Sequence, residues 1–593
     1  MKKIIYGLLL FPSLLKAQGT EFAFLETNNI RARTDYLGRL FNDESLNTAG
    51  FEVPAGSGNN TIYISGLWMG GYRNNSLKCS AQSFQDGDFQ QGPVMDASWY
   101  NSQLATWQRV WKITKNDLEY HQQNFTNPGY VMPEAIENWP AHGDVSKGQA
   151  YYLAPFWDVN ANGIYDPGNG DYPKIKGDDA IYMIFNDDKL HLVTGGSPYK
   201  MEIHAMLYAF ECSDYNVLNN TVFVEYKIIN RSNYNYTDNY IGMWTDFDIG
   251  CSNDDFIASD VQRSMFYGYN GDGTDGACSG SPGFGDYVPM TGVVFLDGPK
   301  QIADGIDNPL TNNVQYAVNN NGIVYSGTGN GFGDGVVDNE RLNMRHFMYY
   351  FRDDVTPLPA QGEPSNANDF YRYIKGIWQD NTPVYYGGSG HQTSPGAIQN
   401  GLLEYGYMFP GSSDPLYWGS DGVPFVTSPW SEISEGNVPA DRRGVGSTGP
   451  FNFNPGETIT IQFAFVYAAS STPNDSLSAL PVLQQRADAL HTWYNLNGTP
   501  CGGSFGLSAE EVEPDVDVSV FPNPASEFIM IQYPENFSPE ITLSDISGRE
   551  ILFSQEKISS SQLRISLSEI SAGSYFIVLR SGETTMMKKI IKQ

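Results

Sequence analysis

The sequence predicts a mostly β protein, with a large β-sandwich-like body, one clear helix and a small C-terminal β-sandwich. The first observation is compositional. Of 593 residues, 61 are Gly, 34 are Pro and 37 are Tyr, whereas only 17% are charged. Such a profile suits short strands joined by turns better than long helices. The second observation is that short apolar runs alternate with clusters of turn residues, and the body also carries long Gly-, Asp- and Asn-rich loops.

The N-terminus has the layout of a secretory signal peptide over residues 1–17. Lys2 and Lys3 form a positively charged start, and an apolar run from Ile4 to Leu15 follows. A small residue, Ala17, then precedes Gln18 as a cleavage point. The run is too short to span a membrane, and no later stretch approaches 18 uninterrupted apolar residues. We therefore expect an exported chain with no transmembrane segment.

The acidic balance of the chain excludes a class of partners. The sequence has 67 Asp and Glu against 35 Lys and Arg, which gives a formal net charge of −32. A nucleic-acid binder needs a basic face to displace counterions, so we expect no nucleic-acid partner.

Five cysteines lack the CxxC spacing of zinc or redox motifs. Cys251 and Cys278 bracket one Gly/Asp-rich segment, and the odd total leaves at least one thiol unpaired within a monomer.

The predicted body covers residues 18–505 and has room for two subdomains. A strand is predicted over 221–229, with 240–244 as its expected neighbour, and another long strand over 458–467. The wide separation between the first and last of these predicts a non-local sandwich with large inserted loops. One amphipathic helix is predicted over 476–494, with Asp475 as its N-cap.

The clearest chemical motif in the body is an oxygen-rich loop over 158–166. Calcium prefers six to eight oxygen ligands, and alternating Asp and Asn side chains followed by Gly supply such ligands around a sharp bend. An EF-hand needs Glu at the twelfth position, where this chain has Asn169. An isolated calcium loop, similar to thrombospondin type 3 loops, is the better comparison, and a metal-free loop of Asx turns is the alternative. The expected cofactor is calcium in a stabilising role, with the ligands Asp158, Asn160, Asn162, Ile164 and Asp166.

A second acidic cluster follows the predicted strand at 240–244. Asp246 and Asp248 share one face if the segment is extended, and Asp254 lies a few residues further on. Three interpretations stay open for these residues: a second metal site, a glycosidase acid/base pair, or a solvated loop edge.

The C-terminal segment 518–593 predicts a small immunoglobulin-like sandwich, preceded by an acidic, Pro-containing linker over 506–517. Turn residues such as Ser547-Gly548 and Ala572-Gly573 separate its short β-like runs. We expect seven short strands, over 518–521, 528–531, 541–543, 551–553, 563–565, 575–579 and 586–591.

The motifs of this segment carry a family resemblance. The runs Phe521-Pro-Asn-Pro524, Ile546-Ser-Gly-Arg-Glu550 and Ala572-Gly-Ser-Tyr-Phe-Ile-Val578 precede a Lys-rich last strand. Together they resemble the type A sorting domain of Bacteroidota type IX secretion cargo, and the main body is loosely similar to uncharacterised cargo proteins. The resemblance implies export to the periplasm by the Sec pathway and then secretion or outer-membrane surface display. It also implies type IX machinery and its sortase as partners, with either release or attachment to surface lipopolysaccharide. The motif positions are Pro522, Asn523, Pro524, Gly548, Gly573 and Tyr575.

Signatures of known enzyme classes are absent from the sequence. It has no HExxH zinc motif, no GxSxG nucleophile elbow and no P-loop. We therefore expect a non-catalytic adhesive, structural or ligand-binding component that calcium stabilises. The alternative is a secreted hydrolase that acts on glycans and uses Asp246 or Asp248 as a catalytic carboxylate.

Overall fold

The structure is a computed structural model of the chain. It describes residues 21–495 and 519–592, with the exception of residues 85, 213–215, 279, 326–328, 353–357, 426–427, 522–524, 534–538, 546–550, 569, 572 and 582–583. The predicted signal peptide and the predicted linker over 506–517 lie outside the described residues. The chain divides into two compact units, the body and the C-terminal tail, which are described separately below.

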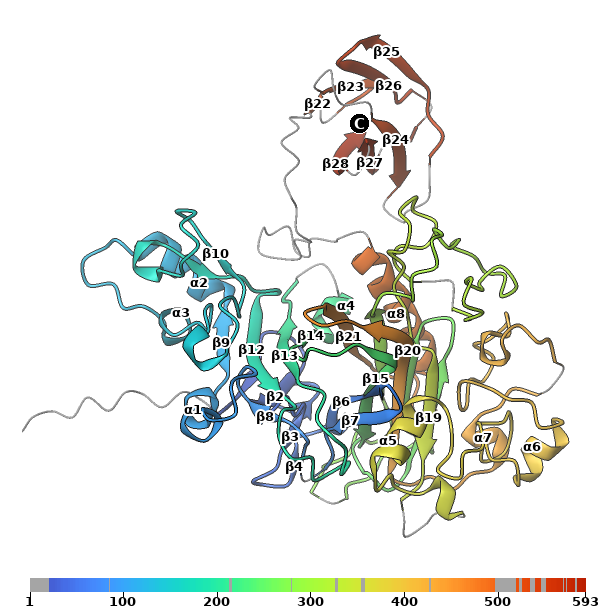
Figure 1. Cartoon of the computed structure of the whole chain (residues 1–593). Coiled ribbons are helices and arrows are strands. Elements are labelled where there is room, and N and C mark those ends of the chain that lie inside the picture. The colour runs from blue at the N-terminus through green and yellow to red at the C-terminus, as the bar shows by residue number, and fades with distance from the viewer. Residues whose placement is uncertain are drawn as a thin grey trace, which may run out of the picture. The chain divides into compact units, whose positions relative to one another are not determined.

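A large antiparallel sheet forms one layer of the body (Figure 1). Its strands are almost wholly buried, as expected for long apolar segments that other elements cover on both faces. In spatial order the strands are β16 (Asp255–Asp260), β17 (Met265–Asn270), β18 (Met290–Asp297), β21 (Thr458–Ala468), β14 (Thr221–Asn230), β13 (Met201–Ala209), β12 (Asp179–Asn186) and β8 (Gln90–Gln91), with β9 (Trp111–Thr114) also paired to β12.

The pairing of β14 with β21 confirms the prediction of a non-local sandwich. Val222 lies opposite Phe465 in this ladder, and the register runs without a break from Thr221 to Ile229. The chain between the two strands supplies strands to both layers of the body.

The second layer consists of two smaller antiparallel sheets. One contains β19 (His346–Tyr350), β20 (Arg442–Phe453), β15 (Tyr236–Phe247), β6 (Ile62–Arg73) and β7 (Ser76–Ala81), and the other contains β1 (Phe22–Leu25), β2 (Arg31–Asp35) and β5 (Phe51–Glu52). The predicted pairing of 240–244 with the strand before it was wrong, because β15 pairs with β6 and β20. The side chain of Asn230 donates hydrogen bonds to the carbonyl oxygens of Tyr234 and Phe453, and so fixes the corner at which the chain changes sheets.

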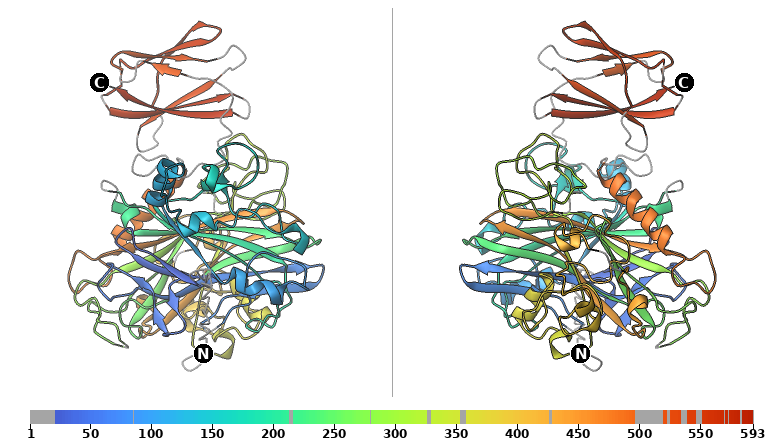
Figure 2. Two further views of the ribbon diagram at one scale, coloured as in Figure 1. Left: turned by 90° about the vertical axis from the view of Figure 1, so that its left-hand side faces the viewer. Right: turned by 90° about the vertical axis from the view of Figure 1, so that its right-hand side faces the viewer.

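Figure 2 shows the strand layers of the body in two further views. Aromatic side chains fill the space between the two layers. Phe41, just after β2, contacts Phe465 of β21 with ring centroids 4.7 Å apart. Further along the interface, Phe266 of β17 stacks on Phe347 of β19 at 5.1 Å. All four side chains are fully buried, so they form part of the hydrophobic core that holds the layers together.

Short helices and hairpins in the connections complete the body. The predicted helix at 476–494 is confirmed, but it begins later, as α8 (Leu480–Asn495). Asp475 is not its N-cap, since its carboxylate instead accepts the backbone N–H of Leu477 in the preceding turn. The remaining elements are α1 (Tyr100–Trp107), α2 (Lys115–Asn124), α3 (Glu134–Glu137), α4 (Asn216–Asn219), α5 (Ala367–Ile374), α6 (Pro395–Gln399), α7 (Glu432–Glu435), β3 (Asn42–Asp43), β4 (Thr48–Ala49), β10 (Phe156–Trp157) and β11 (Tyr172–Pro173).

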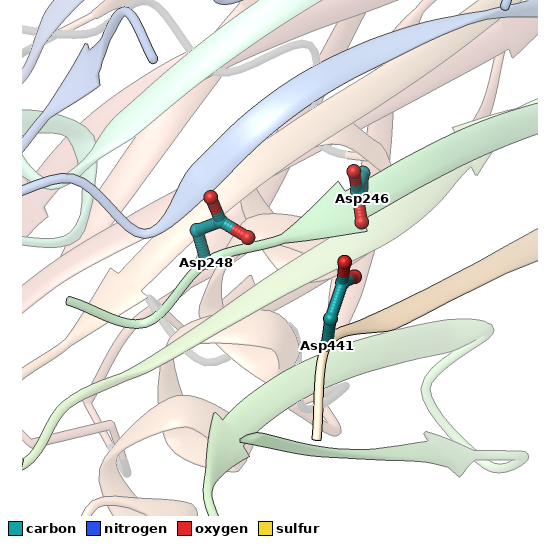
Figure 3. Close-up of side chains that lie close together, drawn as sticks. All are labelled: Asp246, Asp248 and Asp441. Carbon is teal, nitrogen blue, oxygen red and sulfur yellow. The ribbon is translucent and has the colours of Figure 1, made fainter. Parts of the chain in front are cut away.

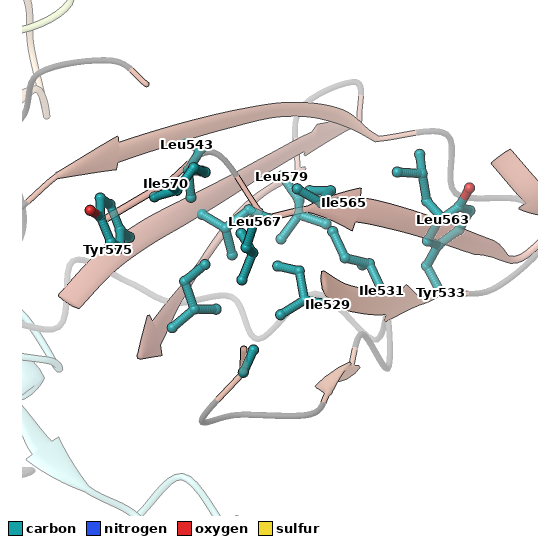
Figure 4. Close-up of a cluster of buried hydrophobic side chains, with 13 residues drawn as sticks. Ile529, Ile531, Tyr533, Leu543, Leu563, Ile565, Leu567, Ile570, Tyr575 and Leu579 are labelled. Atoms are coloured by element: carbon teal, nitrogen blue, oxygen red, sulfur yellow. The ribbon is translucent and has the colours of Figure 1, made fainter. Parts of the chain in front are cut away.

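The described residues of the tail form a small sandwich of two antiparallel sheets. The first sheet contains β22 (Ser519–Phe521), β23 (Phe528–Gln532), β26 (Gln562–Ser566) and β25 (Gln555–Ser559), and the second contains β24 (Glu540–Asp545), β27 (Gly573–Ser581) and β28 (Thr584–Lys592). Figure 4 shows the buried side chains of its core, which include Ile529, Leu543 and Leu579. Seven strands were predicted, but the fourth lies at 555–559 rather than 551–553. Its residues are all exposed, so apolar alternation does not reveal it.

Candidate functional site

The register between β15 and β20 brings four charged residues onto one face of the sheet. Asp246 lies opposite Arg443, and Phe247 lies opposite Arg442. Asp248 directly follows the end of β15, and Asp441 directly precedes the start of β20, so both lie at this end of the ladder. Because side chains alternate in direction along a strand, Asp246, Asp248, Asp441 and Arg443 project to the same side.

The carboxylates of Asp246, Asp248 and Asp441 meet at this strand end. One oxygen from each lies within 4.8 Å of the others. Figure 3 shows the three side chains facing one another, two from the end of β15 and one from the segment that leads into β20. We call these three residues the aspartate cluster.

The aspartate cluster lies on the face of its sheet that points away from the sandwich core. Phe247 points toward the other sheet, where its ring centroid is 6.0 Å from that of Phe266. Its neighbour Asp246 must then point the opposite way, on the same side as Trp244, whose ring stacks on Trp68 at 5.9 Å. The site is therefore built on rigid strands whose aromatic neighbours are fully buried.

The aspartate cluster lines a pocket of about 550 Å³. We call it the acidic pocket. A disulfide between Cys251 and Cys278 joins two parts of the pocket region, and Cys79 is a free, buried thiol. The pocket is lined by Asn47, Thr48, Ala49, Gly58, Asn60, Tyr63, Phe84, Asp246, Asp248, Gly250, Ser252, Cys278, Gly280, Ser281, Arg352, Asp441 and Arg443.

Arg443 is the main positive charge beside the aspartate cluster. Its guanidinium donates to Asp441 at 2.7 Å and to Glu363 at 2.7 Å, and its Nε lies 3.7 Å from Asp246 Oδ1. Arg352 donates to the same oxygen of Asp441 at 3.3 Å. Although burial by itself lowers the pKa of Arg443, the adjacent Asp246 and Asp441 carboxylates raise it, so this guanidinium stays charged.

Two of the carboxylates have strongly shifted pKa values. Burial raises the pKa of Asp246 well above its ordinary value, against the opposing effect of Arg443. Burial also raises the pKa of Asp248 to about 7, and the negative charge of Asp441 adds to this effect. The aspartate cluster can therefore hold a proton near neutral pH, or it can bind a cation that offsets the repulsion between its charges.

Asp254, which was predicted to join Asp246 and Asp248, is not part of the aspartate cluster. Burial raises its pKa to about 6, and the nearby charges of Asp275 and Asp272 add to the shift. The third carboxylate beside Asp246 and Asp248 is instead Asp441, which the sequence analysis did not identify. The sequence signal for Asp441 is the charged run Asp441-Arg442-Arg443, which lies opposite Asp246-Phe247-Asp248 in the antiparallel ladder.

The predicted calcium loop brings its polar side chains together at the surface. Asp158 Oδ1 and Asn160 Oδ1 both accept the backbone N–H of Asn162 at 3.1 Å. The side-chain amides of Asn160 and Asn162 donate to the two carboxylate oxygens of Asp166. The Ile164 side chain is exposed, and its N–H donates to Asn162 Oδ1.

A buried carboxylate, Asp171, accepts hydrogen bonds from the backbone of this loop. It accepts the backbone N–H of Val159 at 2.8 Å and that of Asp166 at 3.0 Å, and it is fully buried. Asp178 and Asp179, the next acidic residues along the chain, have other partners: Asp178 accepts the N–H of Glu211, and Asp179 lies 3.4 Å from the ammonium group of Lys112.

Comparison with known families decides the nature of the tail. Residues 519–593 match the family model of the secretion system C-terminal sorting domain. The tail is a sorting domain. The protein is therefore type IX secretion cargo that is exported to the medium or to the cell surface. Within the described part of the chain, no helix is long and apolar enough to cross a membrane.

The described motif residues of the sorting domain have structural roles. Gly573 begins β27, and the buried Tyr575 donates a hydrogen bond from its hydroxyl to the carbonyl oxygen of Ser571 at 2.9 Å. The motif positions Pro522, Asn523, Pro524 and Gly548 lie outside the described residues.

The other comparisons give no information on the activity of the body. No curated protein matches the chain. A solved polysaccharide lyase matches with 10% identity and a TM-score of 0.16, over 66% of this chain and 34% of the lyase. The chain thus spans about a third of the length of that lyase, and a TM-score this low does not support a shared fold or activity.

Proposed function

We propose that the exported body is a non-catalytic ligand-binding component of the cell surface or extracellular medium, and that its ligand occupies the acidic pocket. The observation that carries the proposal is the convergence of the aspartate cluster, Arg443 and Arg352 in a pocket of about 550 Å³. Small-molecule sites usually have volumes of about 300–1,000 Å³ and a few converging polar groups.

The lining of the acidic pocket favours a hydroxyl-rich ligand such as a glycan. Carboxylates accept hydrogen bonds from hydroxyl groups, and guanidinium groups donate to their oxygens. Tyr63 and Phe84 add aromatic surface to the wall, with ring centroids 6.5 Å apart. Aromatic surface of this kind contacts the apolar faces of sugar rings.

The body is proposed to be stabilised by calcium at the loop Asp158–Asp166. The oxygens of Asp158 and Asn160 share one backbone donor, and the amides of Asn160 and Asn162 converge on Asp166, so the expected ligands lie within one small region. Gly163 adopts a left-handed conformation with φ of 76°, as the sharp bend of such a loop requires.

A glycan hydrolase is the second candidate function, and one observation favours it. Asp248, with its pKa raised to about 7, is suited to be a general acid, while Asp441 is paired with Arg443 and Arg352. Two adjacent carboxyl groups, one of them suited to be the acid, match the requirement of glycoside hydrolysis.

One experiment separates the two functions. The purified full chain is screened on a glycan array for binding and on a polysaccharide panel for released reducing ends. The ligand-binding function predicts retention of glycans without turnover, and Arg443→Met should weaken that retention at least tenfold. Repeated turnover that Asp248→Asn abolishes would overturn the non-catalytic proposal in favour of the hydrolase.

A further inference from the structure

The acidic pocket contains buried oxygen atoms that accept no hydrogen bond. Asp246 Oδ1 is one of them, in a side chain that is 4% exposed. Two further buried oxygens also accept no hydrogen bond: Asp441 Oδ1 and the side-chain oxygen of Asn60, which also lines the pocket. Buried acceptors without a donor are costly, and three in one pocket point to a positively charged group that belongs there.

Arg443 does not satisfy these oxygens. Its Nε is 3.7 Å from Asp246 Oδ1, beyond hydrogen-bond distance. Its two terminal nitrogens donate to Glu363 and Asp441 Oδ2, and Arg352 also donates to Asp441 Oδ2. Both arginines thus bind one oxygen of Asp441 and leave its other oxygen without a donor.

The spacing of the aspartate cluster fits a single ion. Oxygen atoms bound to one Ca²⁺ at about 2.3–2.6 Å lie at most about 4.6–5.2 Å from one another. One oxygen from each of Asp246, Asp248 and Asp441 meets this condition, since the three lie within 4.8 Å of each other. The three carboxylates can therefore bind the same ion without a change in the backbone.

The local charge also matches a divalent ion. When ionised, the aspartate cluster and Glu363 carry four negative charges, and Arg443 and Arg352 carry two positive charges. These six side chains thus leave two negative charges, which one divalent cation neutralises. All donors available to it are oxygens, which suit a hard cation such as Ca²⁺ rather than a soft metal.

We propose that Asp246, Asp248 and Asp441 bind a divalent cation of the calcium class at the base of the acidic pocket. Asn60 and water complete its ligands on the pocket side. This inference extends the proposed function, since the ion lies where the ligand is proposed to bind and offers a coordination position to a ligand oxygen. It is separate from the predicted calcium loop at 158–166, which shares no residue with it.

Calcium titration of the full chain tests this site. The protein is stripped with EDTA, dialysed and titrated with CaCl₂ by calorimetry, in a background that carries Asp158→Asn so that the surface loop does not contribute. We expect one remaining calcium ion per chain. Adding Asp248→Asn or Asp441→Asn should weaken its affinity at least tenfold, whereas Asp254→Asn, outside the aspartate cluster, should not.

Two results would overturn the inference: no calcium binding in the Asp158→Asn background, or an affinity that Asp248→Asn and Asp441→Asn leave unchanged. Circular dichroism of each variant checks that it is folded, and Asp246→Asn replaces any variant that is not. Failure of the proposed function is distinguishable, because glycan retention is measured separately with and without calcium. If glycans are still retained in EDTA and calcium does not bind, the proposed ligand-binding function stands and only the proposed cation site is refuted.

Discussion

Asp246 on β15 and Arg443 on β20 lie directly opposite each other, with Arg443 Nε 3.7 Å from Asp246 Oδ1. The same guanidinium binds Asp441 and Glu363, so one side chain holds carboxylates from three separate segments of the chain. Because Arg443 is 5% exposed, these interactions are shielded from solvent. This pair connects the stability of the body to the geometry of the acidic pocket.

Removal of the Arg443 charge should destabilise the body strongly. Arg443→Met leaves the buried Asp246 and the partly buried Asp441 without their main cation, and breaking a buried pair in this way costs about 3–5 kcal/mol. Urea unfolding of the EDTA-treated protein measures the change. Arg31→Met is the control, because its pair with Glu26 is exposed and is worth about 1 kcal/mol or less. Equal losses in the two variants would contradict the prediction.

The raised pKa of Asp254 should make stability depend on pH. Its pKa is about 6 in the folded protein, above the value of an unfolded Asp, so the folded state binds the proton more tightly. Its contribution is therefore present at acidic pH and is lost as the pH rises from about 4 to 6. After allowance for partial exposure, the free energy of unfolding relative to Asp254→Asn should fall by about 1 kcal/mol across that range. Denaturation curves of both proteins at several pH values measure this difference, and a constant or rising difference would refute it.

Loss of the Cys251–Cys278 disulfide should weaken the region around the acidic pocket. The bond closes a loop with a sequence separation of 27, for which chain entropy predicts about 3–4 kcal/mol of stabilisation. The double variant Cys251→Ser/Cys278→Ser should show this loss in chemical denaturation. Cys79→Ser is a control for cysteine replacement, since this buried thiol forms no disulfide. A double variant as stable as the parent would show that the cross-link does not restrict the unfolded chain.

Calcium removal should lower the melting temperature through the loop Asp158–Asp166. Ligands that bind only the folded state stabilise it by mass action, so EDTA should shift the melting curve downward by several degrees. Asp158→Asn and Asp166→Asn should reduce the part of the shift that comes from the loop. Asp178→Asn is the matched control, because Asp178 accepts a hydrogen bond from Glu211 instead. An EDTA effect of equal size in all of these variants would exclude the loop.

The sorting domain should be required for export and should depend on its small core. Deletion of residues 519–593 should leave the body inside the cell, which immunoblots of cell and medium fractions measure. Ile577 is fully buried in this core, and truncation of such a side chain to Ala costs about 2–5 kcal/mol. Ile577→Ala should therefore lower export as well, whereas the exposed Leu552→Ala should not. Normal export of the deletion variant would overturn the assignment.

Local signals predicted most of the secondary structure that the sequence analysis identified. The alternation in 221–229 and 458–467 corresponds to β14 and β21, and the tail contains six of its seven predicted strands where they were expected. The same signals did not reveal α5, which is only eight residues long, or the exposed strand β25. The partner of β15 was also missed, because a strand that is buried on both faces carries no alternation that distinguishes one sheet from another.

The candidate site was predicted only in part. Asp246 and Asp248 were recognised because they share one face of a strand, which depends on local geometry alone. Asp441 was not recognised, and Asp254 was expected in its place, because closeness in sequence suggested the nearer residue. The pairing of β15 with β20 is what places Asp441 beside Asp246 and Asp248.

The sequence by itself determined that this protein is exported, that it is mostly β and that it carries an oxygen-rich loop, since these properties reside in short contiguous segments. Only the tertiary structure decided which carboxylates form the acidic pocket. The reason is physical: side chains from distant segments meet only when two strands pair in one particular register, and a shift by one residue turns every side chain of a strand to the other face.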